Sequence, residues 1–431
     1  MNKIYRRFTE GQLLSIVIAL SLLMRCITVL VLEIAPVSDY LAYDQMASNL
    51  LAGHVMTDNF GNVAFYSGGY PLFFLAPIYA LFGHHLLAAQ LGNAVLGALT
   101  TYLIYLLLRE TKASVFARII GPLMFALYVP SWLYCEYLAK ENLMTLLLLL
   151  LMYLSARMHQ KLTISSALAA GAVVAPLAIT GTAGLALLPV PIIALICANA
   201  SIQTKLHTGL AFLLAAMVLL APWQYRNAQL LGSPVITTNG GFNLYLGNNP
   251  NADGFFVSIG DTPLGGEWKQ LRDKGEVYAS AWLKDKAIEW IADHPARFAE
   301  LAVKKAGLFW MPPIHQGNGP SSKIESATRI IWLIEYLILC VPAAYILMTM
   351  RRRNRIVIGI GAAIILYSAV HMMFYVIFRY REPVMPMVVI LAALGIEALV
   401  FRFTKRPATL PTYLPATDGY DMGEENIVYK A

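Results

Sequence analysis

The chain has 431 residues, of which 58% are hydrophobic and 13% are charged. Its mean hydropathy of +0.60 excludes a soluble enzyme with a single anchor and indicates a polytopic membrane protein. The formal net charge is +7, but the lysines and arginines stand in short scattered clusters, which is typical of membrane loops and not of nucleic-acid binding. The four cysteines lie in or at the ends of apolar runs, so neither a disulfide framework nor a cysteine metal site is expected.

The first apolar run, Leu13–Leu32, follows a basic N-terminal segment and has no small-residue cleavage site after it, so we expect a retained transmembrane helix. Further runs approach the ~20 residues that cross the hydrocarbon core. We therefore predict an all-α polytopic fold of about ten transmembrane helices, with interfacial helices in the first external loop. The expected spans are 12–32, 86–108, 114–134, 142–156, 164–180, 183–199, 207–222, 327–349, 356–378 and 384–401.

The segment Tyr70–Phe82 decides the topology. It is apolar but contains two prolines, and at ~1.5 Å rise per residue it is too short to cross as a helix. If it does not cross, every short basic loop lies on the side of the N-terminus, as the positive-inside tendency requires. We therefore expect an interfacial or re-entrant helix here and both termini in the cytoplasm. The basic residues concerned are Lys3, Arg6, Arg7, Arg109, Lys112, Arg118, Arg157, Lys161, Lys205, Arg351, Arg352, Arg353, Arg355, Arg402, Lys405 and Arg406.

This topology divides the chain into four parts. Residues 1–222 form an N-terminal transmembrane module with a first external loop at 33–85, and residues 223–326 form an external loop or small mixed cap. In the cap, a turn-rich stretch precedes a helical pattern from Glu276 to Trp310, where Pro295 marks the boundary between two helices. Residues 327–401 hold the C-terminal transmembrane helices, and residues 402–431 form a flexible cytoplasmic tail.

Asp39 follows the first span in Pro36-Val37-Ser38-Asp39-Tyr40. Ser38 is suited to the N-cap of a helix that starts at Asp39, and Gly53 is suited to its end. A carboxylate in the first turn of an amphipathic helix indicates chemistry at the membrane surface, whereas the alternative is that Asp39 only stabilises the helix dipole. The apolar residues of this helix recur at helical spacing and would face the lipid boundary; they are Tyr43, Met46, Ala47, Leu50 and Leu51.

A second carboxylate, Glu136 or Glu141, stands on the same external side at the mouth of the third and fourth spans. Ionisable groups at membrane depth are costly and are often functional, although pairing with Lys140 is the alternative. Arg379 and Arg381 close the ninth span on this side, and arginine is suited to phosphate; a pair with Glu382 is the alternative.

Arg226 is expected on the same surface, but its sequence context indicates a functional role less strongly. Arg25 lies inside the first span and is expected to be structural. The histidines are dispersed and do not suggest a metal site. The sequence contains no Walker loop, no GxSxG elbow and no Cys-x-x-Cys, and no cytosolic domain large enough to bind a nucleotide sugar is expected.

Several short motifs then follow one another in a specific order. They are Ser38-Asp39 with Tyr43, Ala47 and Gly53; Ser67-Gly68-Gly69-Tyr70-Pro71-Leu72; Glu141-Asn142-Leu143-Met144-Thr145; Pro222-Trp223 with Arg226-Asn227; Gly240-Gly241-Phe242-Asn243-Leu244-Tyr245-Leu246-Gly247-Asn248; and Arg379-Tyr380-Arg381. In this order the chain resembles a bacterial glycosyltransferase of the GT-C superfamily, in the glycosyltransferase family 39 group. Its relatives include the protein mannosyltransferases and the aminoarabinose transferase of lipid A. The likeness extends to about Phe401, and Ser67-Gly68 stands where prolines are common in the family.

The resemblance implies an enzyme of the plasma (bacterial inner) membrane that moves a sugar from a polyprenyl-phosphate-linked donor to a glycan, lipid or protein acceptor on the external face, with inversion. It implies that Asp39 is the catalytic acidic residue, and it favours Glu141 over Glu136 as the second site. Asp39 would act as general base, and Glu141 would orient the acceptor or share a divalent cation, Mg or Mn, with Asp39.

In the same reading, the lipid phosphate would be stabilised by Arg379, Arg381 and Arg226, and Tyr43 and Tyr70 would help to bind the donor. Tyr70–Phe82 and the helix after Asp39 would form the groove that admits the prenyl chain from the membrane lipids. No nucleic-acid partner is expected.

Two other functions remain open from the sequence. One is a transporter or flippase of a lipid-linked sugar, although such proteins place ionisable groups near the midplane and often contain internal repeats, which this sequence does not show. The other is a non-catalytic partner in a polysaccharide assembly complex, with the large loop as its docking surface.

Overall fold

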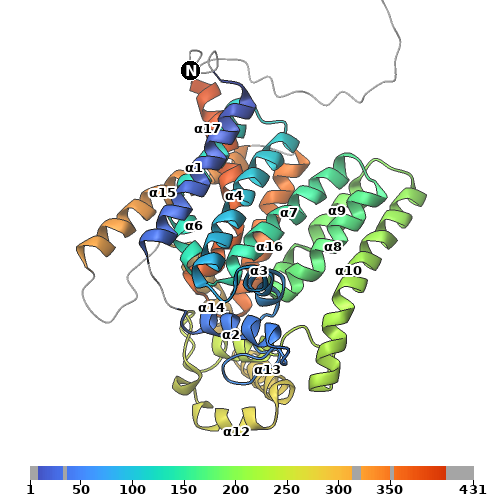
Figure 1. Cartoon of the computed structure of the whole chain (residues 1–431), viewed down its shortest axis with the longest axis vertical. Helices are drawn as coiled ribbons and strands as arrows, with labels where there is room; N and C mark the ends of the chain where they lie inside the picture. Colours follow the sequence, from blue (N-terminus) through green and yellow to red (C-terminus); the bar gives the residue numbers. More distant parts are fainter. Residues whose placement is uncertain (1–7, 33–35, 313–321, 350–353, 404–431) are drawn as a thin grey trace, which may run out of the picture.

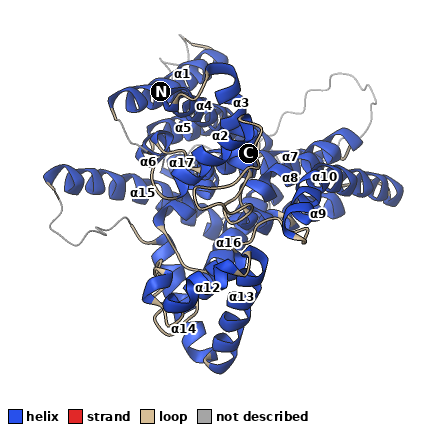
Figure 2. Cartoon of the chain, turned by 60° about the horizontal axis from the view of Figure 1, so that its bottom comes forward, coloured by secondary structure: helices blue, strands red, loops and turns tan. Residues whose placement is uncertain are grey.

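The structure, a computed structural model, describes residues 8–32, 36–312, 322–349 and 354–403. The regular elements of these residues are helices joined by loops, and the only strand pairing among them is an isolated bridge between Phe255 and Val376. Figure 2 accordingly shows helices and loops and no strand arrow. The expected all-α class is confirmed. The expected mixed cap is wrong for the described residues, because its apolar side chains recur at helical spacing and pack helix on helix.

Among the described residues, seven helices are long and apolar enough to cross a membrane, and the bent pair α5–α6 would make an eighth span. The seven are α1 (Glu10–Val31), α4 (Leu86–Glu110), α7 (Lys140–Gln160), α10 (Ile202–Leu231), α15 (Lys323–Thr349), α16 (Arg355–Met373) and α17 (Met385–Phe403). The pair consists of α5 (Val115–Leu127) and α6 (Val129–Leu133), with a bend of 58° at the break. The chain is therefore a multi-pass membrane protein.

Two further expected spans are helical but short. They form α8 (Ile164–Thr180) and, after a 3-10 segment, α9 (Pro189–Cys197), and each apolar stretch has 10–17 residues. Pro189 explains why α9 begins separately from the 3-10 segment, because it has no N–H group with which to continue a preceding helix. The expected number of about ten spans is thus confirmed for seven or eight, and the other two segments are shorter apolar helices.

Tyr70–Phe82 does not form a span, in agreement with the sequence prediction. It forms one π-helical turn, Pro71–Leu75, followed by α3 (Ala76–Phe82), and Gly83 ends it with a φ of +77°. Pro77 lacks an N–H group, which explains the irregular helix. Gly69 lies against the end of α8, where an added Cβ would be 2.4 Å from the Thr180 nitrogen. The segment is therefore held tightly to the helix bundle.

The bundle has two distinct ends (Figure 1). At one end lie the start of α1, the end of α17 and the loops that carry the short basic clusters; Arg118 contacts Glu10, and Arg157 contacts Glu110. The other end carries α2 (Asp39–Leu51), α3 and the cap. Of the expected basic residues, Lys3, Arg6, Arg7, Arg351, Arg352, Arg353, Lys405 and Arg406 lie outside the described residues, as does the tail 404–431.

The cap consists of short helices and two longer ones. They are α11 (Gly240–Gly247), α12 (Trp268–Asp273), α13 (Glu276–Asp293) and α14 (Pro295–Trp310). The break at Pro295 is where the sequence predicted it. Lys305 on α14 is fully buried and donates to the Gly247 carbonyl at 2.8 Å and to Asn248 Oδ1 at 3.2 Å, which fastens α14 to the end of α11.

Helix α17 is the centre of the bundle. Its side chains are almost all buried, and it packs along α15, α5 and α4, while α8 packs along α10. Close approach to α15 needs Gly395, because a Cβ there would lie 2.1 Å from the Pro342 carbonyl oxygen. In contrast, α10 and α15 expose many large apolar side chains, which suits contact with lipid. The 3-10 segment Phe378–Val384 directly precedes α17 and is therefore attached to this central helix.

Candidate active site

Asp39 is the first residue of α2 and lies at the end of the bundle that carries the cap. The helix start and its end near Gly53 agree with the sequence prediction. Ser38 is the N-cap residue, but its hydroxyl does not bond a helix N–H; it donates to Asp39 Oδ1 at 3.3 Å. Its backbone has a φ of +52°, a region that disfavours side chains and is often found at functional sites. A strained residue thus fixes the direction in which the Asp39 carboxylate enters the site.

The apolar face of α2 does not face lipid, contrary to expectation. Tyr43, Met46 and Ala47 are buried in the main hydrophobic core. Helical periodicity identifies an apolar face but does not distinguish a lipid neighbour from a protein neighbour. The large apolar residues that α2 exposes are Leu41 and Leu51. Helix α2 is therefore a packed wall of the site.

Glu141 lies in the first turn of α7, where the N-terminal end of the helix dipole favours a carboxylate. The turn before it is fixed by Asn142, whose amide donates to the carbonyls of Tyr134 and Tyr137 at 3.0 and 3.2 Å. The side chain of Glu141 is 6% exposed and that of Asp39 is 25% exposed. Asp39 is accordingly the carboxylate that a substrate reaches more easily.

Arg379 joins the two carboxylates. Its Nη2 donates a hydrogen bond to Asp39 Oδ2, and its Nε lies 3.5 Å from Glu141 Oε1. Its Nη1 donates to the Tyr40 hydroxyl at 3.0 Å. The arginine comes from the 3-10 segment before α17, so three segments far apart in the sequence meet at one guanidinium. In a partly buried site such pairs are stronger than at a surface, because water screens them less.

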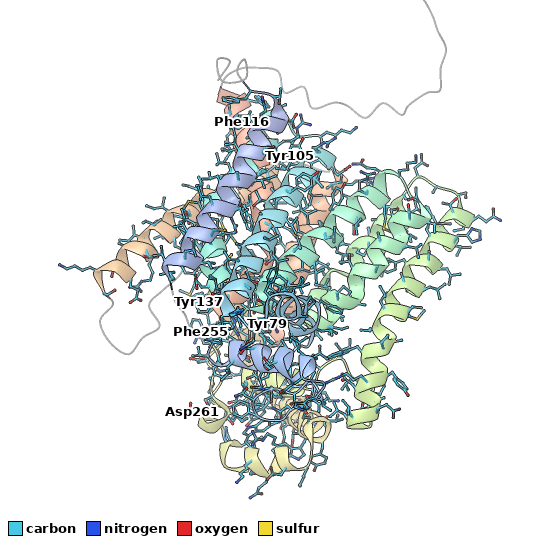
Figure 3. All side chains as sticks on the ribbon, in the orientation of Figure 1. Tyr79, Tyr105, Phe116, Tyr137, Phe255 and Asp261 are labelled. Atoms are coloured by element: carbon cyan, nitrogen blue, oxygen red, sulfur yellow. The ribbon has the colours of Figure 1, made fainter. Side chains whose placement is uncertain are left out.

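Tyrosine rings surround this cluster. The guanidinium carbon of Arg379 lies 5.4 Å from the centre of the Tyr40 ring and 5.8 Å from that of Tyr380, a cation–π arrangement. Tyr40 in turn packs on Tyr137, with ring centres 5.0 Å apart. Burial raises the pKa of Tyr43 well above its usual value, and the charges of Asp39 and Glu141 raise it further, so this phenol stays protonated beside the carboxylates. Figure 3 shows Tyr137, Tyr79 and Phe255 at this end and Tyr105 and Phe116 at the opposite end.

Arg381 and Arg226 do not join this cluster. Arg381 is fully buried and donates to the carbonyls of Phe309 and Met311 at 3.2 and 2.5 Å, and its Nε lies 3.8 Å from Glu382, the partner that the sequence offered as an alternative. Arg226 donates to the Met56 carbonyl at 2.8 Å and to the Val63 carbonyl at 3.4 Å. The first arginine holds the end of α14, and the second holds the first external loop.

The remaining candidates have defined places. Tyr70 is buried, packs edge-to-face on Tyr43, and donates from its hydroxyl to Asn93 Oδ1 at 2.9 Å. Glu136 faces Gln90, whose amide donates to its carboxylate at 3.0 Å, and it has no contact with Arg379. Arg25 faces protein as expected, because it donates to Ser131 Oγ at 2.8 Å. Of Glu136 and Glu141, Glu141 is thus the one that meets Asp39 through Arg379.

Lys140, which the sequence offered as an alternative partner of Glu136 or Glu141, pairs with neither of them among the described residues. Its ammonium group lies 3.5 Å from Ser67 Oγ, and within the described ranges it has no carboxylate within ion-pair distance. It is half-buried beside the first external loop. The ring of tyrosines was missed; Tyr40 and Tyr380 directly follow Asp39 and Arg379 in the sequence, and that adjacency was the available signal.

A shared divalent cation does not fit these residues. In the part of the chain that the structure describes, no group of three His, Cys, Asp or Glu side chains could hold a metal ion. Asp39 and Glu141 are brought together through the guanidinium of Arg379, which takes the position between them that a bridging ion would need. A cation placed there would first have to displace Arg379, and repulsion between the two charges opposes that.

The chain is similar to known proteins in part of its sequence and in its fold. Residues 70–225 match the family model described as Dolichyl-phosphate-mannose-protein mannosyltransferase. The fold is similar to that of ArnT from Cupriavidus metallidurans in the apo state, with a TM-score of 0.57 and 14% identity over 91% of this chain and 60% of that chain. It is also similar to the apo oligosaccharyltransferase from Archaeoglobus fulgidus, with a TM-score of 0.53 and 13% identity over 95% of this chain and 53% of that chain.

No curated protein sequence matches the chain significantly. The chain spans 60% and 53% of the lengths of the two solved structures. The family match thus supports the resemblance found in the sequence over residues 70–225, and the two solved structures show the shared fold.

Proposed function

We propose, from the family match over residues 70–225 and the GT-C fold, that this chain is a membrane glycosyltransferase that uses a polyprenyl-phosphate-linked sugar donor. The observation that carries the proposal is the meeting of Asp39 and Glu141 at Arg379, at the end of the bundle covered by the cap. The ArnT of Cupriavidus metallidurans shares this fold. The acceptor belongs to the cell envelope, as a glycan, a lipid or a protein.

In the proposed reaction, Asp39 is the general base. It removes the proton from an acceptor hydroxyl while that oxygen attacks the anomeric carbon of the donor, and the bond from this carbon to the phosphate oxygen breaks. The phosphate leaves with the electron pair, as a polyprenyl phosphate, and attack from the opposite side inverts the anomeric centre. Glu141, which is less exposed, holds Arg379 in place and orients the acceptor.

Two cations serve the leaving phosphate. Arg379 stabilises its developing charge, since a preorganised guanidinium binds phosphate in two-point geometry. Lys140 supplies a second positive charge that is not already matched by a carboxylate among the described residues. Arg226 and Arg381 support this arrangement by holding the first loop and the end of α14.

The prenyl chain enters from the membrane beside α3. Phe73, in the turn before α3, and Leu81 and Phe82, at its end, are 44%, 77% and 63% exposed, so Pro71–Phe82 offers an apolar surface. Tyr43 and Tyr70 form the wall behind it. The proposed orientation places the site outside and both termini in the cytoplasm, because the described basic loops gather at the opposite end.

The test is to incubate the purified chain in lipid nanodiscs or vesicles with a labelled polyprenyl-phosphate sugar and envelope acceptors. Transfer of label to an acceptor supports the proposal. Movement of intact donor across the vesicle membrane without transfer would identify a flippase, and absence of both would favour an assembly partner. Either of the last two results contradicts the proposed activity.

A further inference from the structure

A cavity of about 290 Å³ lies between the first external loop and the cap. The loop contributes Phe60, Phe65 and Tyr66, and the cap contributes Phe242, Trp268 and Arg272. Its volume is near the lower end of the roughly 300–1,000 Å³ that small-molecule sites occupy, which suits one sugar ring better than an extended lipid. The family resemblance and the site around Asp39 leave this cavity without a function.

Aromatic rings form a continuous surface in the cavity. Phe65 meets Phe242 edge-to-face with ring centres 5.2 Å apart, and Phe242 meets Trp268 at 5.0 Å. Aromatic faces carry a partial negative charge, so they attract the slightly positive C–H groups on the flat side of a pyranose ring. A surface of this kind recognises sugar rings without specifying every hydroxyl.

The cavity walls are fastened together by Glu276. Its carboxylate accepts hydrogen bonds from the backbone N–H groups of Val63 and Ala64 and from the Thr238 hydroxyl at 2.7 Å. These three donors bind both carboxylate oxygens of Glu276, so its negative charge is stabilised by groups of the cavity wall itself. The loop and the cap therefore form one preorganised site and do not merely touch.

Arg272 is the charged residue of the cavity lining whose guanidinium is available to bind a ligand. No carboxylate of the described residues lies within ion-pair distance of its guanidinium, and no described group accepts a hydrogen bond from it. It is half-buried at the end of α12, four residues after Trp268. An arginine in this state is suited to a carboxylate or a phosphate presented beside the aromatic surface.

Tyr66 connects this cavity with the catalytic cluster. It lines the cavity, and on its other side it meets Tyr43 edge-to-face with ring centres 6.0 Å apart. Burial and then the negative charge of Asp39 raise the pKa of Tyr66, so Asp39 acts on the same phenol from the other side. A ligand in the cavity would therefore be separated from Asp39 only by a tyrosine wall.

We propose that this cavity binds an anionic sugar unit of the acceptor, with the ring on Phe242 and Trp268 and the negative group on Arg272. The inference rests on the proposed function, which requires an acceptor next to Asp39. A uronic acid and a phosphorylated sugar share this chemistry, since both combine a pyranose ring with an anion. The cavity holds the unit next to the one that reacts and so selects acceptors by charge.

The experiment measures binding to the full chain in nanodiscs by saturation-transfer NMR and titration calorimetry, without a donor. The probes are methyl β-D-glucuronide, glucose 6-phosphate and the neutral methyl β-D-glucoside. We expect at least one anionic probe to bind about tenfold more tightly than the neutral glucoside, because a charge-assisted hydrogen bond is added. Which anion binds more tightly distinguishes a uronate acceptor from a phosphorylated one.

Variants locate the binding. Arg272→Gln is expected to remove the preference for the anion, Arg272→Lys to keep part of it, and Trp268→Ala to weaken all three probes. Lys269→Gln is the matched control, because Lys269 is exposed on the same helix and does not line the cavity. Thermal unfolding of each variant shows whether the fold is intact.

The proposal is overturned if the neutral glucoside binds as well as the anions, if no probe binds the wild-type chain, or if Lys269→Gln loses the preference as fully as Arg272→Gln. These readouts need no turnover, so they are independent of the sugar-transfer assay. If the protein transfers sugar but binds neutral and anionic probes equally well, only the role given to the cavity is contradicted. If it binds anionic probes preferentially but transfers no sugar, only the proposed enzyme activity is contradicted.

Discussion

Arg379 Nε lies 3.5 Å from Oε1 of Glu141, and the same guanidinium donates a hydrogen bond to Asp39. The three residues come from the starts of α2 and α7 and from the segment before α17. Because the arginine is shared, the position of each carboxylate depends on the other. The following predictions test what this shared pair and its surroundings do.

Asp39→Asn is expected to lower sugar transfer by about 10²–10⁴-fold, the usual contribution of a general base, because the amide cannot accept the proton of the acceptor. The measurement is the initial rate of transfer from a labelled polyprenyl-phosphate sugar by purified, folded protein. Asp44→Asn is the matched control on the same helix, since Asp44 pairs with His84 and Tyr79 instead. Near wild-type transfer by Asp39→Asn would show that the base assignment is wrong.

Arg379→Lys keeps the charge but is expected to lower the rate by about 10²–10³-fold, the range seen when one oxyanion donor is lost. A lysine cannot reach Asp39, Glu141 and Tyr40 with one planar group. The rate is compared with that of Arg297→Lys, an exposed cap position paired with Glu300. Equal rates for the two variants would contradict the role given to Arg379.

Lys140→Met is expected to raise the KM for the donor about tenfold with a smaller change in kcat, because a charge-assisted contact to the phosphate is lost in the bound state. Steady-state kinetics with varied donor concentration measures the changes in KM and kcat separately. Lys161→Met, at the other end of α7 and exposed, should leave both constants unchanged. An unchanged KM in Lys140→Met would remove this lysine from the donor site.

Removal of divalent cations with a chelator is expected to change the transfer rate less than about twofold, since Arg379 already supplies the positive charge between the carboxylates. Rates are measured before and after dialysis against chelator, and after Mg or Mn is added back. Loss of activity that either ion restores would show that a metal displaces Arg379 in the working enzyme.

Lys305 gives the stability a pH dependence. Burial lowers its pKa from 10.5 to about 8, so between these values the unfolded chain binds more protons than the folded chain. The free energy of unfolding therefore rises with pH in this window, as the cost of burying the charged form is relieved. Thermal unfolding at pH 7.5–10 should show this rise for wild type and for Lys304→Met, whose residue is exposed, and not for Lys305→Met. A rise of equal size in Lys305→Met would contradict it.

The local elements were largely predictable from the sequence. The short helix before Gly83 and the break at Pro295 follow from glycine and proline preferences, which act within a few residues. The start of α2 at Asp39 was predicted as well, although Ser38 makes no side-chain cap bond there. The strained backbone of Ser38 was not predictable, because only the surrounding packing holds a serine at a φ of +52°.

The pairing within the site was only partly predictable. The sequence placed Asp39, Glu141 and Arg379 at the same end of the bundle, but their contact depends on how α17 packs, which no local pattern encodes. Arg379 and Arg381 looked equivalent, yet they point to different neighbours, because the tight 3-10 segment turns side chains two positions apart in different directions. Arg272 and Glu276 carried no signal, since their importance arises from a cavity between distant segments.

One consequence of the bridge made by Arg379 concerns the approach of an anion to Asp39. Any anion that reaches this guanidinium competes with Asp39 for it, whereas a neutral water molecule does not. The guanidinium proposed to bind the leaving phosphate is thus the same group that holds the proposed base in the site. The position of Asp39 and the binding of a phosphate at Arg379 are therefore coupled through one side chain.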